Sequence, residues 1–373
     1  MKILVFSWRD PKHPLAGGAE QVMHEHMKGW VKAGHTVTLF SSSIKGEKQS
    51  EVLDGVRIVR GGYQYLGVQL AGLNFYLTER KNFDLIIDQF HGIPFFTPLY
   101  ARKPKVAVIQ ESARYVWFLN PLPWPFNYLV GLLGYLIEPF VFLLYKGTPF
   151  ITGSNSAKED VANFGIPKKS ISVIPHGVLI QKTKKAYKKE RVPAVCYLGV
   201  LSKDKGIEKG VKAFKLLGKG FQFWVIGKAE TRRYAGKVKK LVRKLGLERK
   251  IKFWGFVNRN KKFELLAKAH VLINPSAHEG WGLVNIEANA VGTPVVAYRN
   301  PGLVDSVNDG VSGILTNKNT PEELAIEITE LLRDERIYKR MCETARAWSK
   351  NFSWEKSKAL SLKVIERLYE EKR

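Results

Sequence analysis

Residues 274–297 of the chain are NPSAHEGWGLVNIEANAVGTPVVA. A short apolar strand, Val271–Asn274, is expected to end where this stretch begins, and a loop with two glycines follows it. The pattern then predicts a helix over Trp281–Val291 and a second strand over Pro294–Ala297. A strand, a loop, a helix and a further strand in this order are typical of a doubly wound α/β domain with a parallel sheet.

The same alternation of strand and helix extends over the rest of the chain. Most of the expected strands are short apolar runs without polar alternation, as in sheets that are covered on both faces. The other expected strands are Ile3–Ser7, Thr36–Phe40, Val56–Val59, Leu85–Asp88, Val106–Ile109, Phe150–Gly153, Ala194–Gly199, Phe221–Gly227 and Ile251–Gly255. The other expected helices include Gly18–Ala33, Ile207–Leu217, Arg232–Leu245, Arg259–Lys268 and one that begins at Thr320-Pro321-Glu322-Glu323, a capping box with proline at the first turn.

A polar, basic segment divides the chain. Residues 181–193, QKTKKAYKKERVP, contain six Lys and Arg and no apolar run, so we interpret them as a linker. The 373 residues suffice for two domains with real cores. We therefore expect two Rossmann-like, doubly wound domains over residues 1–180 and 194–352, a cleft between them that binds the ligand, and a final helix over 353–373.

Composition narrows the class of protein. The chain has 60 Lys and Arg against 34 Asp and Glu, a net charge of +26, so its partners are expected to be nucleic acid, an anionic membrane surface or phosphorylated small molecules. The two cysteines, Cys196 and Cys342, cannot form a disulfide framework, and no Cys and His cluster has the spacing of a zinc site. We expect an intracellular protein, since the apolar run at the N-terminus is too short for a signal peptide.

The loop between Asn274 and the following helix has the chemistry of an anion site. Free backbone N–H groups and the helix dipole suit a diphosphate there, and glycines allow a ligand to approach the backbone closely. Glu279 and Glu287 are placed so that their carboxylates can accept hydrogen bonds from sugar hydroxyls. The alternative is a surface loop followed by an ordinary amphipathic helix.

The whole stretch resembles the signature of the group 1 (family 4) retaining glycosyltransferases. Members carry Glu-Gly-aromatic-Gly-Leu, here Glu279 to Leu283, a second Glu eight positions later, here Glu287, and then Ala-x-Ala-x-Gly-x-Pro-Val-Val-Ala, here 288–297. Further matches are Gly17-Gly18-Ala19-Glu20, Ile174-Pro175-His176-Gly177-Val178, Leu198-Gly199 with Lys205-Gly206, Pro301-Gly302 and Phe352-Ser353-Trp354. The resemblance covers essentially the whole chain and is specific to the family, but not to a substrate.

The resemblance implies a GT-B fold whose second domain holds a UDP- or GDP-sugar. Glu287 would then bind the ribose hydroxyls, Glu279 would contact the donor sugar, and Lys205 would bind the diphosphate. The amides around Gly280, Gly282, Leu283 and Val284 would complete the diphosphate site. The final helix would cross back to the first domain.

The resemblance also implies a mechanism. A hexosyl group would be transferred with retention by same-face substitution, in which the leaving diphosphate helps to deprotonate the acceptor hydroxyl. For such a reaction the protein has to supply positive charge to the leaving group and to position the two substrates. We therefore expect neither a metal nor another cofactor.

Gly17 and Gly18 stand after the first strand, at the start of a helix. Their backbone N–H groups can reach a phosphate or an acceptor. The pattern is not G-x-G-x-x-G, and no acidic residue ends the second strand, so a dinucleotide-dependent dehydrogenase is disfavoured. The alternative is a glycine turn that only allows tight packing.

The sequence departs from the family pattern at several positions. Val200 replaces the usual Arg after the strand glycine, so Lys203 or Lys205 has to supply the second positive charge, and a lysine is not equivalent to a bidentate arginine. Leu179 replaces the usual Asp of the expected hinge.

Two more departures concern the acceptor side and the hinge. Gln110 replaces a usual His and is followed by Glu111, and Gln cannot act as a base at neutral pH. His91, at the end of another strand, is the candidate catalytic histidine on the acceptor side, although a lone His is more often structural. His176 replaces the Asn that usually precedes Gly177 in the hinge.

A long apolar segment covers residues 115–145. It has ten aromatic residues, and its first part contains Pro121, Pro123 and Pro125, which exclude a helix there. The following 20 residues are apolar all round except for Asn127 and Glu138-Pro139, so they form a membrane-interface anchor or lipid groove, a buried core helix, or a transmembrane span. With the positive charge, including that of residues 182–191, this favours a peripheral enzyme on the inner face of the cell membrane with a lipid-linked or glycan acceptor.

Three other functions remain as alternatives. A nucleic-acid-binding protein is suggested by charge alone, and the basic residues are spread rather than arranged in a stripe with aromatic residues. An interaction protein with a degenerate donor site is suggested by Val200 and Gln110. A GT-B epimerase or phosphorylase fits the motif glutamates less well. Base, sugar, acceptor and linkage stay open.

Overall fold

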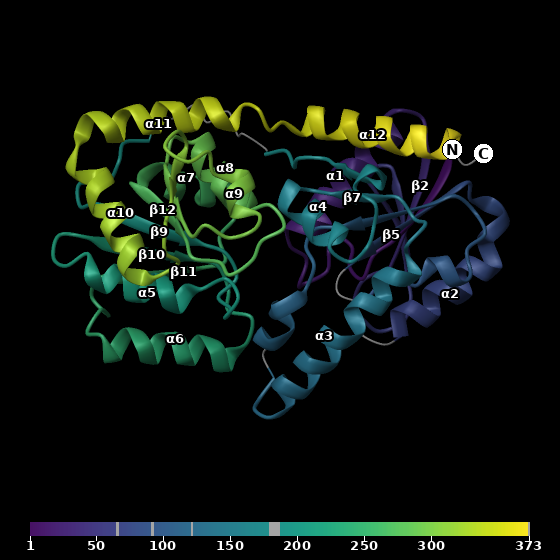
Figure 1. Cartoon of the computed structure of the whole chain (residues 1–373), viewed down its shortest axis with the longest axis horizontal. Helices are drawn as coiled ribbons and strands as arrows, with labels where there is room; N and C mark the ends of the chain where they lie inside the picture. Colours follow the sequence, from purple (N-terminus) through teal and green to yellow (C-terminus); the bar gives the residue numbers. More distant parts are fainter. Residues whose placement is uncertain (65–66, 91–92, 121, 179–186, 372–373) are drawn as a thin grey trace. The chain divides into compact units, whose positions relative to one another are not determined.

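The computed structural model describes residues 1–64, 67–90, 93–120, 122–178 and 187–371, and it divides into two compact units. Unit 1 comprises Met1–Arg114, Tyr135–Gly177 and Ser353–Arg373, and unit 2 comprises Tyr115–Gly134 and Val178–Phe352. Both are α/β units with helices around a sheet (Figure 1). The sequence analysis assigned all of residues 115–145 to the first domain, whereas the structure groups their first part with unit 2.

Unit 1 is built on an eight-stranded sheet in the order β3-β4-β2-β1-β5-β6-β7-β8. All neighbouring strands are parallel except β3 and β4, which form an antiparallel edge. The strands are β1 Lys2–Phe6, β2 Thr36–Ser41, β3 Ser50–Leu53, β4 Val56–Arg60, β5 Leu85–Phe90, β6 Lys105–Ile109, β7 Phe150–Thr152 and β8 Ile171–Val173. The sequence analysis did not predict β3 and β8.

The helices of unit 1 include α1 Gly18–Lys32, α2 Gly67–Glu79, α4 Asn155–Ala162 and α12 Trp354–Glu370. The final helix, α12, packs on α1: the Trp30 indole N–H donates to Ser361 Oγ at 2.9 Å, and His26 Nε2 lies 3.0 Å from Ser357 Oγ. Ile365 and Leu368 of α12 join the core formed by β1, β2 and β5. The last helix therefore belongs to unit 1, although it follows unit 2 in the chain.

Unit 2 has a six-stranded, fully parallel sheet in the order β11-β10-β9-β12-β13-β14. The strands are β9 Ala194–Leu198, β10 Gln222–Ile226, β11 Ile251–Gly255, β12 Val271–Asn274, β13 Val295–Ala297 and β14 Gly313–Leu315. The helices are α5 Ile207–Leu216, α6 Arg232–Lys244, α7 Arg259–Lys268, α8 Leu283–Ala290, α9 Leu303–Ser306, α10 Pro321–Arg333 and α11 Glu335–Ser349. The predicted start of α10 is confirmed, because Thr320 Oγ1 accepts a hydrogen bond from the Glu323 N–H at 3.3 Å. The predicted α/β fold with two Rossmann-like sheets is thus confirmed, whereas the cleft between them stays a prediction.

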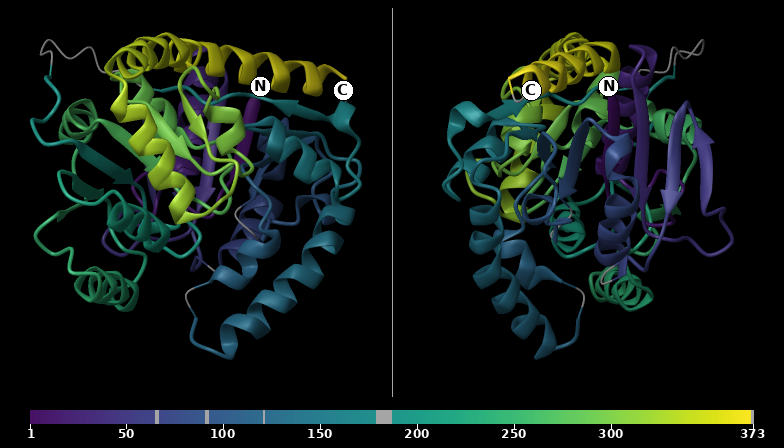
Figure 2. Two further views of the ribbon diagram at one scale, coloured as in Figure 1. Left: turned by 60° about the vertical axis from the view of Figure 1, so that its left-hand side comes forward. Right: turned by 90° about the vertical axis from the view of Figure 1, so that its right-hand side faces the viewer.

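The apolar segment forms α3, Phe126–Leu144, after the 3-10 helix Arg114–Leu119 (Figure 2). By length and composition α3 could cross a membrane, and only 17% of its most apolar window is buried. Leu132, Leu136 and Phe140 are each at least half exposed. The interpretation of this segment as a buried core helix is therefore wrong for most of its length.

Glu138, the one charged residue within α3, is buried and has a structural role. Its two carboxylate oxygens accept hydrogen bonds from the backbone N–H groups of Ala113 and Arg114, at 2.7 and 2.8 Å. Gly131 and Gly134 of the helix lie against the rings of Phe118 and Trp117, so the segment before α3 packs back on the helix. The start of α3 is therefore packed against the 3-10 helix that precedes it.

Candidate functional site

In unit 2 the loops that follow β9 and β12 meet at the carboxyl edge of the sheet. Adjacent parallel strands bring their carboxyl ends to the same edge, where α/β sheets bind ligands. The Ala277 N–H donates to the Asp204 carbonyl at 2.7 Å, which joins the two loops. Gly206 has φ +70°, and a side chain there would collide with the Pro275 carbonyl. Only a glycine therefore allows this close approach.

The joined loops bring Lys205 and Glu279 together. Lys205 Nζ lies 3.1 Å from Glu279 Oε2, 3.4 Å from the His278 carbonyl oxygen and 3.7 Å from Asp204 Oδ2. The two side chains of the ion pair are 23% and 18% exposed, so solvent reaches both. Glu279 Oε1 in turn accepts a hydrogen bond from Ser276 Oγ at 2.9 Å, which orients the carboxylate.

A neighbouring turn supports the loop that carries Glu279. The Glu279 N–H donates to the Pro301 carbonyl at 3.2 Å, and Asn300 Nδ2 donates to the Ser276 carbonyl at 2.8 Å. Gly302 has φ +76° and lies against the Glu279 backbone, so a side chain there would collide with the Glu279 carbonyl. The motif Pro301-Gly302 thus holds the backbone of Glu279 in place through a hydrogen bond and close packing.

Helix α8 begins in the same loop, since its N-cap, Gly282, follows Glu279 by three residues. Its N-cap is Gly282, with φ 82° and no capping side chain, so the N–H groups of Leu283 and Val284 are those that a helix start leaves without an intrahelical partner. A buried chain of hydrogen bonds holds this turn: Asn274 Nδ2 donates to Asn285 Oδ1 and Asn285 Nδ2 to Ser306 Oγ, both at 2.9 Å. Such a turn can bind an anion.

Glu287, in the second turn of α8, forms an ion pair with Lys262 of α7. The two side chains are 14% and 23% exposed. Lys262 is not among the site residues expected from the sequence. Its neighbour Lys261 pairs with Glu264 instead, and no sequence signal distinguishes the two lysines.

Lys203 and Val200 lie on the same loop as Lys205 but outside this cluster. Lys203 is exposed, and its carbonyl accepts a weak hydrogen bond from the Gly206 N–H at 3.3 Å. Val200 is half exposed, and its carbonyl accepts a hydrogen bond from the Tyr197 hydroxyl at 2.7 Å. The position where the family has an arginine thus carries an exposed apolar side chain.

In unit 1, Gly17 is the N-cap of α1 and is exposed, as is Gly18. Gly17 has φ −135°, and a Cβ there would meet only Glu20 Oε2, at 3.7 Å. The interpretation of Gly17 as a turn that only allows tight packing is therefore wrong. Glu20 Oε2 accepts the Gly17 N–H at 2.7 Å, and Arg9 Nη1 lies 3.6 Å from Glu20 Oε1.

Gln110 and Glu111 follow β6 in unit 1. Gln110 Oε1 lies 2.7 Å from His176 Nε2. Burial lowers the pKa of His176 to about 3, so the neutral ring donates this hydrogen bond. Glu111 is half-buried, and His91 lies outside the described residues. The side chain of Gln110 thus already has a hydrogen-bond partner within unit 1.

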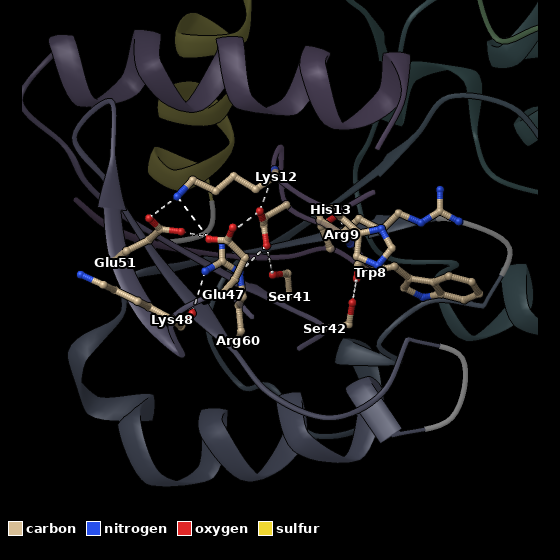
Figure 3. Close-up of polar contacts among 12 residues, drawn as sticks. Trp8, Arg9, Lys12, His13, Ser41, Ser42, Glu47, Lys48, Glu51 and Arg60 are labelled. Atoms are coloured by element: carbon tan, nitrogen blue, oxygen red, sulfur yellow. Dashed lines mark hydrogen bonds and ion pairs between the residues drawn. The ribbon is translucent and has the colours of Figure 1, made fainter. Parts of the chain in front are cut away.

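A second polar cluster lies at the carboxyl edge of the unit 1 sheet (Figure 3). Asp10, after β1, is fully buried and accepts hydrogen bonds from Arg60 at the end of β4, at 2.7 and 3.1 Å, and from Ser41 Oγ at 3.0 Å. Arg60 Nη2 also lies 2.7 Å from Glu51 Oε1, and Glu51 Oε2 lies 2.5 Å from Lys12 Nζ. This network, which the sequence analysis missed, fixes the loop that leads from β1 to Gly17.

In the part of the chain that the structure describes, no group of three or more His, Cys, Asp or Glu side chains has the arrangement of a metal site. Cys196 and Cys342 are both free thiols, and burial raises the pKa of each.

Comparisons with known proteins cover both halves of the chain. The family model described as "Glycosyl transferases group 1" matches residues 180–348, and that described as "Glycosyltransferase Family 4" matches residues 16–182. An uncharacterized glycosyltransferase of Methanocaldococcus jannaschii, MJ1178, is 33% identical over 172 residues, which are 46% of this chain and 47% of the relative. The chain thus spans about half the length of the first curated relatives it matches.

Two solved structures are similar over nearly the whole chain. Sucrose-phosphate synthase from Thermosynechococcus elongatus has a TM-score of 0.81 at 21% identity, with 99% of this chain and 98% of that chain covered. Anabaena Alr3699/HepE in complex with UDP-glucose has a TM-score of 0.74 at 20% identity, with 98% of this chain and 100% of that chain covered. At these identities the similarity concerns the fold.

Proposed function

We propose that the chain, which has the GT-B fold and matches two glycosyltransferase family models over residues 16–182 and 180–348, is a group 1 glycosyltransferase that transfers a hexose from a nucleotide-diphosphate sugar to a hydroxyl group. The observation that carries the proposal is the ion pair between Lys205 and Glu279, in a loop that leads within three residues from Glu279 to Gly282, the N-cap of α8. The Lys205 ammonium group suits the diphosphate, and the Glu279 carboxylate suits the hydroxyls of the sugar. The N–H groups at the start of α8 can stabilise the negative charge that develops on the leaving phosphate.

The donor is a UDP- or GDP-sugar bound by unit 2. Lys205 Nζ and the N–H groups of Leu283 and Val284 bind the diphosphate, and Glu279 accepts hydrogen bonds from the sugar. Glu287 accepts those of the ribose hydroxyls, in competition with Lys262. A relative of the same fold, HepE, has been solved with UDP-glucose, which supports a nucleotide-sugar donor.

The reaction proceeds with retention, by same-face substitution. The bond between the sugar C1 and the diphosphate oxygen breaks while the acceptor oxygen bonds to C1 on the same face, and the acceptor proton passes to the departing phosphate. The protein contributes positive charge on the leaving group and positioning, which Lys205 and the α8 turn provide without a metal ion or another cofactor. The exposed backbone of Gly17 and Gly18 is proposed to bind a phosphate of the donor or the acceptor, and a catalytic role of His91 stays a prediction.

The acceptor is lipid-linked or a membrane-associated glycan, and the enzyme is peripheral on the inner face of the cell membrane. The exposed apolar side chains of α3 support this proposal, since an apolar helix surface of this size is unfavourable in water. Free thiols agree with a reducing compartment. No nucleic acid partner is proposed.

The experiment that tests the donor is a titration with UDP, GDP and their sugar conjugates, followed by thermal unfolding and by hydrolysis of the sugar donor. We expect one nucleotide to stabilise the protein selectively, Glu279→Ala to abolish sugar release, and NMR of the product to show retention of the anomeric configuration. Full activity in EDTA supports the metal-free reaction. No stabilisation by any nucleotide refutes the donor site and favours an interaction protein.

The experiment that tests the membrane proposal replaces exposed apolar residues of α3. Changing Leu132, Leu136 and Phe140 to Ser should release the protein from phosphatidylcholine vesicles without unfolding it, because all three side chains are exposed. A control variant with serine at three exposed leucines of other helices, Leu70, Leu77 and Leu360, should bind as the wild type does. Equal release of both variants, or of neither, contradicts the role of α3.

A further inference from the structure

A large share of the net charge is concentrated in one part of unit 2. Residues 207–250, which contain α5 and α6, have 14 Lys and Arg against three Glu, a net charge of +11 out of +26 for the whole chain. The two helices pack against each other and lie on the same side of the unit 2 sheet (Figure 1). The description of the basic residues as spread, made from the sequence, is therefore wrong for this part of the chain.

Helix α6 shows this concentration most clearly. Seven of its 13 residues are Lys or Arg and none is acidic. Val238 and Val242 are buried against the unit, while all seven cations are exposed. One of them, Lys237, pairs with Glu208. Among the interactions of the described residues, the other six form no ion pair; they are Arg232, Arg233, Lys239, Lys240, Arg243 and Lys244.

Repulsion between neighbouring cations opposes helix formation over part of α6. Lys239 and Arg243, and likewise Lys240 and Lys244, are four residues apart, where like charges repel each other. A face that only needs to be soluble normally mixes both signs of charge. A helix that keeps six unpaired cations on one exposed face is suited to a partner that carries many negative charges.

We propose that the exposed face of α6 binds the anionic headgroups of a lipid bilayer. A bilayer is favoured over nucleic acid because the same chain has the exposed apolar helix α3, and stable attachment of a peripheral protein takes one apolar and one basic element. Stacking on bases needs exposed aromatic side chains, and the one aromatic residue of α6, Tyr234, is partly buried and donates its hydroxyl to Glu208 at 3.0 Å.

The proposal deepens the membrane part of the proposed function and rests on it, but it does not depend on the transferase chemistry. It predicts that unit 2 binds the bilayer through α6. The affinity of this binding depends on lipid charge and on salt, whereas the affinity contributed by α3 depends on neither. Each Lys or Arg close to an anionic surface strengthens binding about fivefold.

The test compares vesicles of phosphatidylcholine alone with vesicles that also contain phosphatidylglycerol, at about 0.1 M salt. In the test variant, Lys239, Lys240, Arg243 and Lys244 are changed to Gln, which preserves helix propensity. In the control variant, four exposed cations elsewhere in unit 2, Lys318, Arg336, Arg340 and Lys350, are changed to Gln, so that both variants lose the same net charge. Thermal unfolding and donor hydrolysis show that each variant is folded.

We expect the α6 variant to lose more than about 100-fold in affinity for the anionic vesicles and to bind neutral vesicles as the wild type does. The control variant should keep most of its affinity for both. Equal losses in the two variants show that only net charge matters and overturn the proposal. Tighter, α6-dependent binding of wild type to duplex DNA than to anionic vesicles overturns it in favour of a nucleic-acid surface. If the wild type does not hydrolyse any sugar donor, the proposed transferase activity is refuted, whereas the result with vesicles is unaffected.

Discussion

Gln110 Oε1 accepts a hydrogen bond of 2.7 Å from His176 Nε2 inside unit 1. These are two of the positions at which the sequence departs from the family pattern, which has His at the first and Asn at the second. The structure places the two departures in contact, so that a histidine and a carboxamide share one hydrogen bond. The His176 ring also lies against Gly153, where a side chain would collide with it.

The hydrogen bond between Gln110 and His176 predicts that the effects of substitutions at these two positions on the free energy of unfolding are strongly coupled. Gln110→His and His176→Asn should each destabilise the protein by about 1–3 kcal/mol, because each change removes one side of this part-buried hydrogen bond. The double variant should recover at least ~1 kcal/mol of the summed loss. Urea unfolding of the four proteins measures this cycle, and simple addition of the two losses would contradict a shared bond.

Glu287→Ala should weaken nucleotide binding by about 1–3 kcal/mol through the loss of hydrogen bonds to the ribose, with little effect on unfolding. The matched control is Glu264→Ala, since Glu264 also pairs with lysines, but with two of its own helix α7, Lys261 and Lys268. Calorimetric titration with the preferred nucleotide should detect the loss in the first variant alone. Unchanged affinity of Glu287→Ala would exclude the ribose role.

Lys205→Ala should lower the rate of donor hydrolysis by about 100-fold or more, because the leaving diphosphate loses a positive charge in the transition state. Lys203→Ala removes a lysine from the same loop whose exposed side chain lies outside the cluster, and should change the rate by less than about threefold. Single-turnover kinetics at saturating donor separate this effect from binding. Similar rates in both variants would mean that Lys205 does not face the diphosphate.

The alternation of strands and helices could be predicted because buried parallel strands such as β9, AVCYL, are continuous apolar runs. Strand β3, Ser50–Leu53, could not, because it is a half-exposed edge whose pairing depends on the turn at Asp54 and Gly55, with φ 51° and 82°. Lys205 and Glu279 could be named from their motifs. Lys262 could not, because its role depends on a contact between two helices.

The Asp10–Arg60 pair illustrates the same limit, since 50 residues separate two charges that are both buried. Arg60→Met should destabilise the protein by about 3–5 kcal/mol, because it leaves the Asp10 carboxylate buried without its cation. Changing both residues, Asp10→Leu with Arg60→Met, should be less harmful than the single change. The control Arg57→Met, on the exposed side of β4, should fall within about 0.5 kcal/mol of wild type in urea unfolding. A mild effect of Arg60→Met would show that water reaches Asp10.

Two buried histidines predict how stability depends on pH. Burial lowers the pKa of His26 to about 4 and that of His176 to about 3, whereas both titrate near 6.5 in the unfolded chain. Below pH 6.5 the unfolded chain therefore binds protons that the folded protein does not, so stability is complete above this pH and decreases as the pH falls.

Between pH 7 and pH 5 each histidine should reduce the free energy of unfolding by about 2 kcal/mol. His26→Asn retains a polar partner for Ser357 and removes one titrating group, so its pH-dependent loss should be about 2 kcal/mol smaller than that of the wild type. The measurement is urea unfolding of wild type and variant at both pH values, and the slope with pH is informative even where the variant is less stable at pH 7. An unchanged slope would show that His26 is protonated in the folded protein, in conflict with its burial.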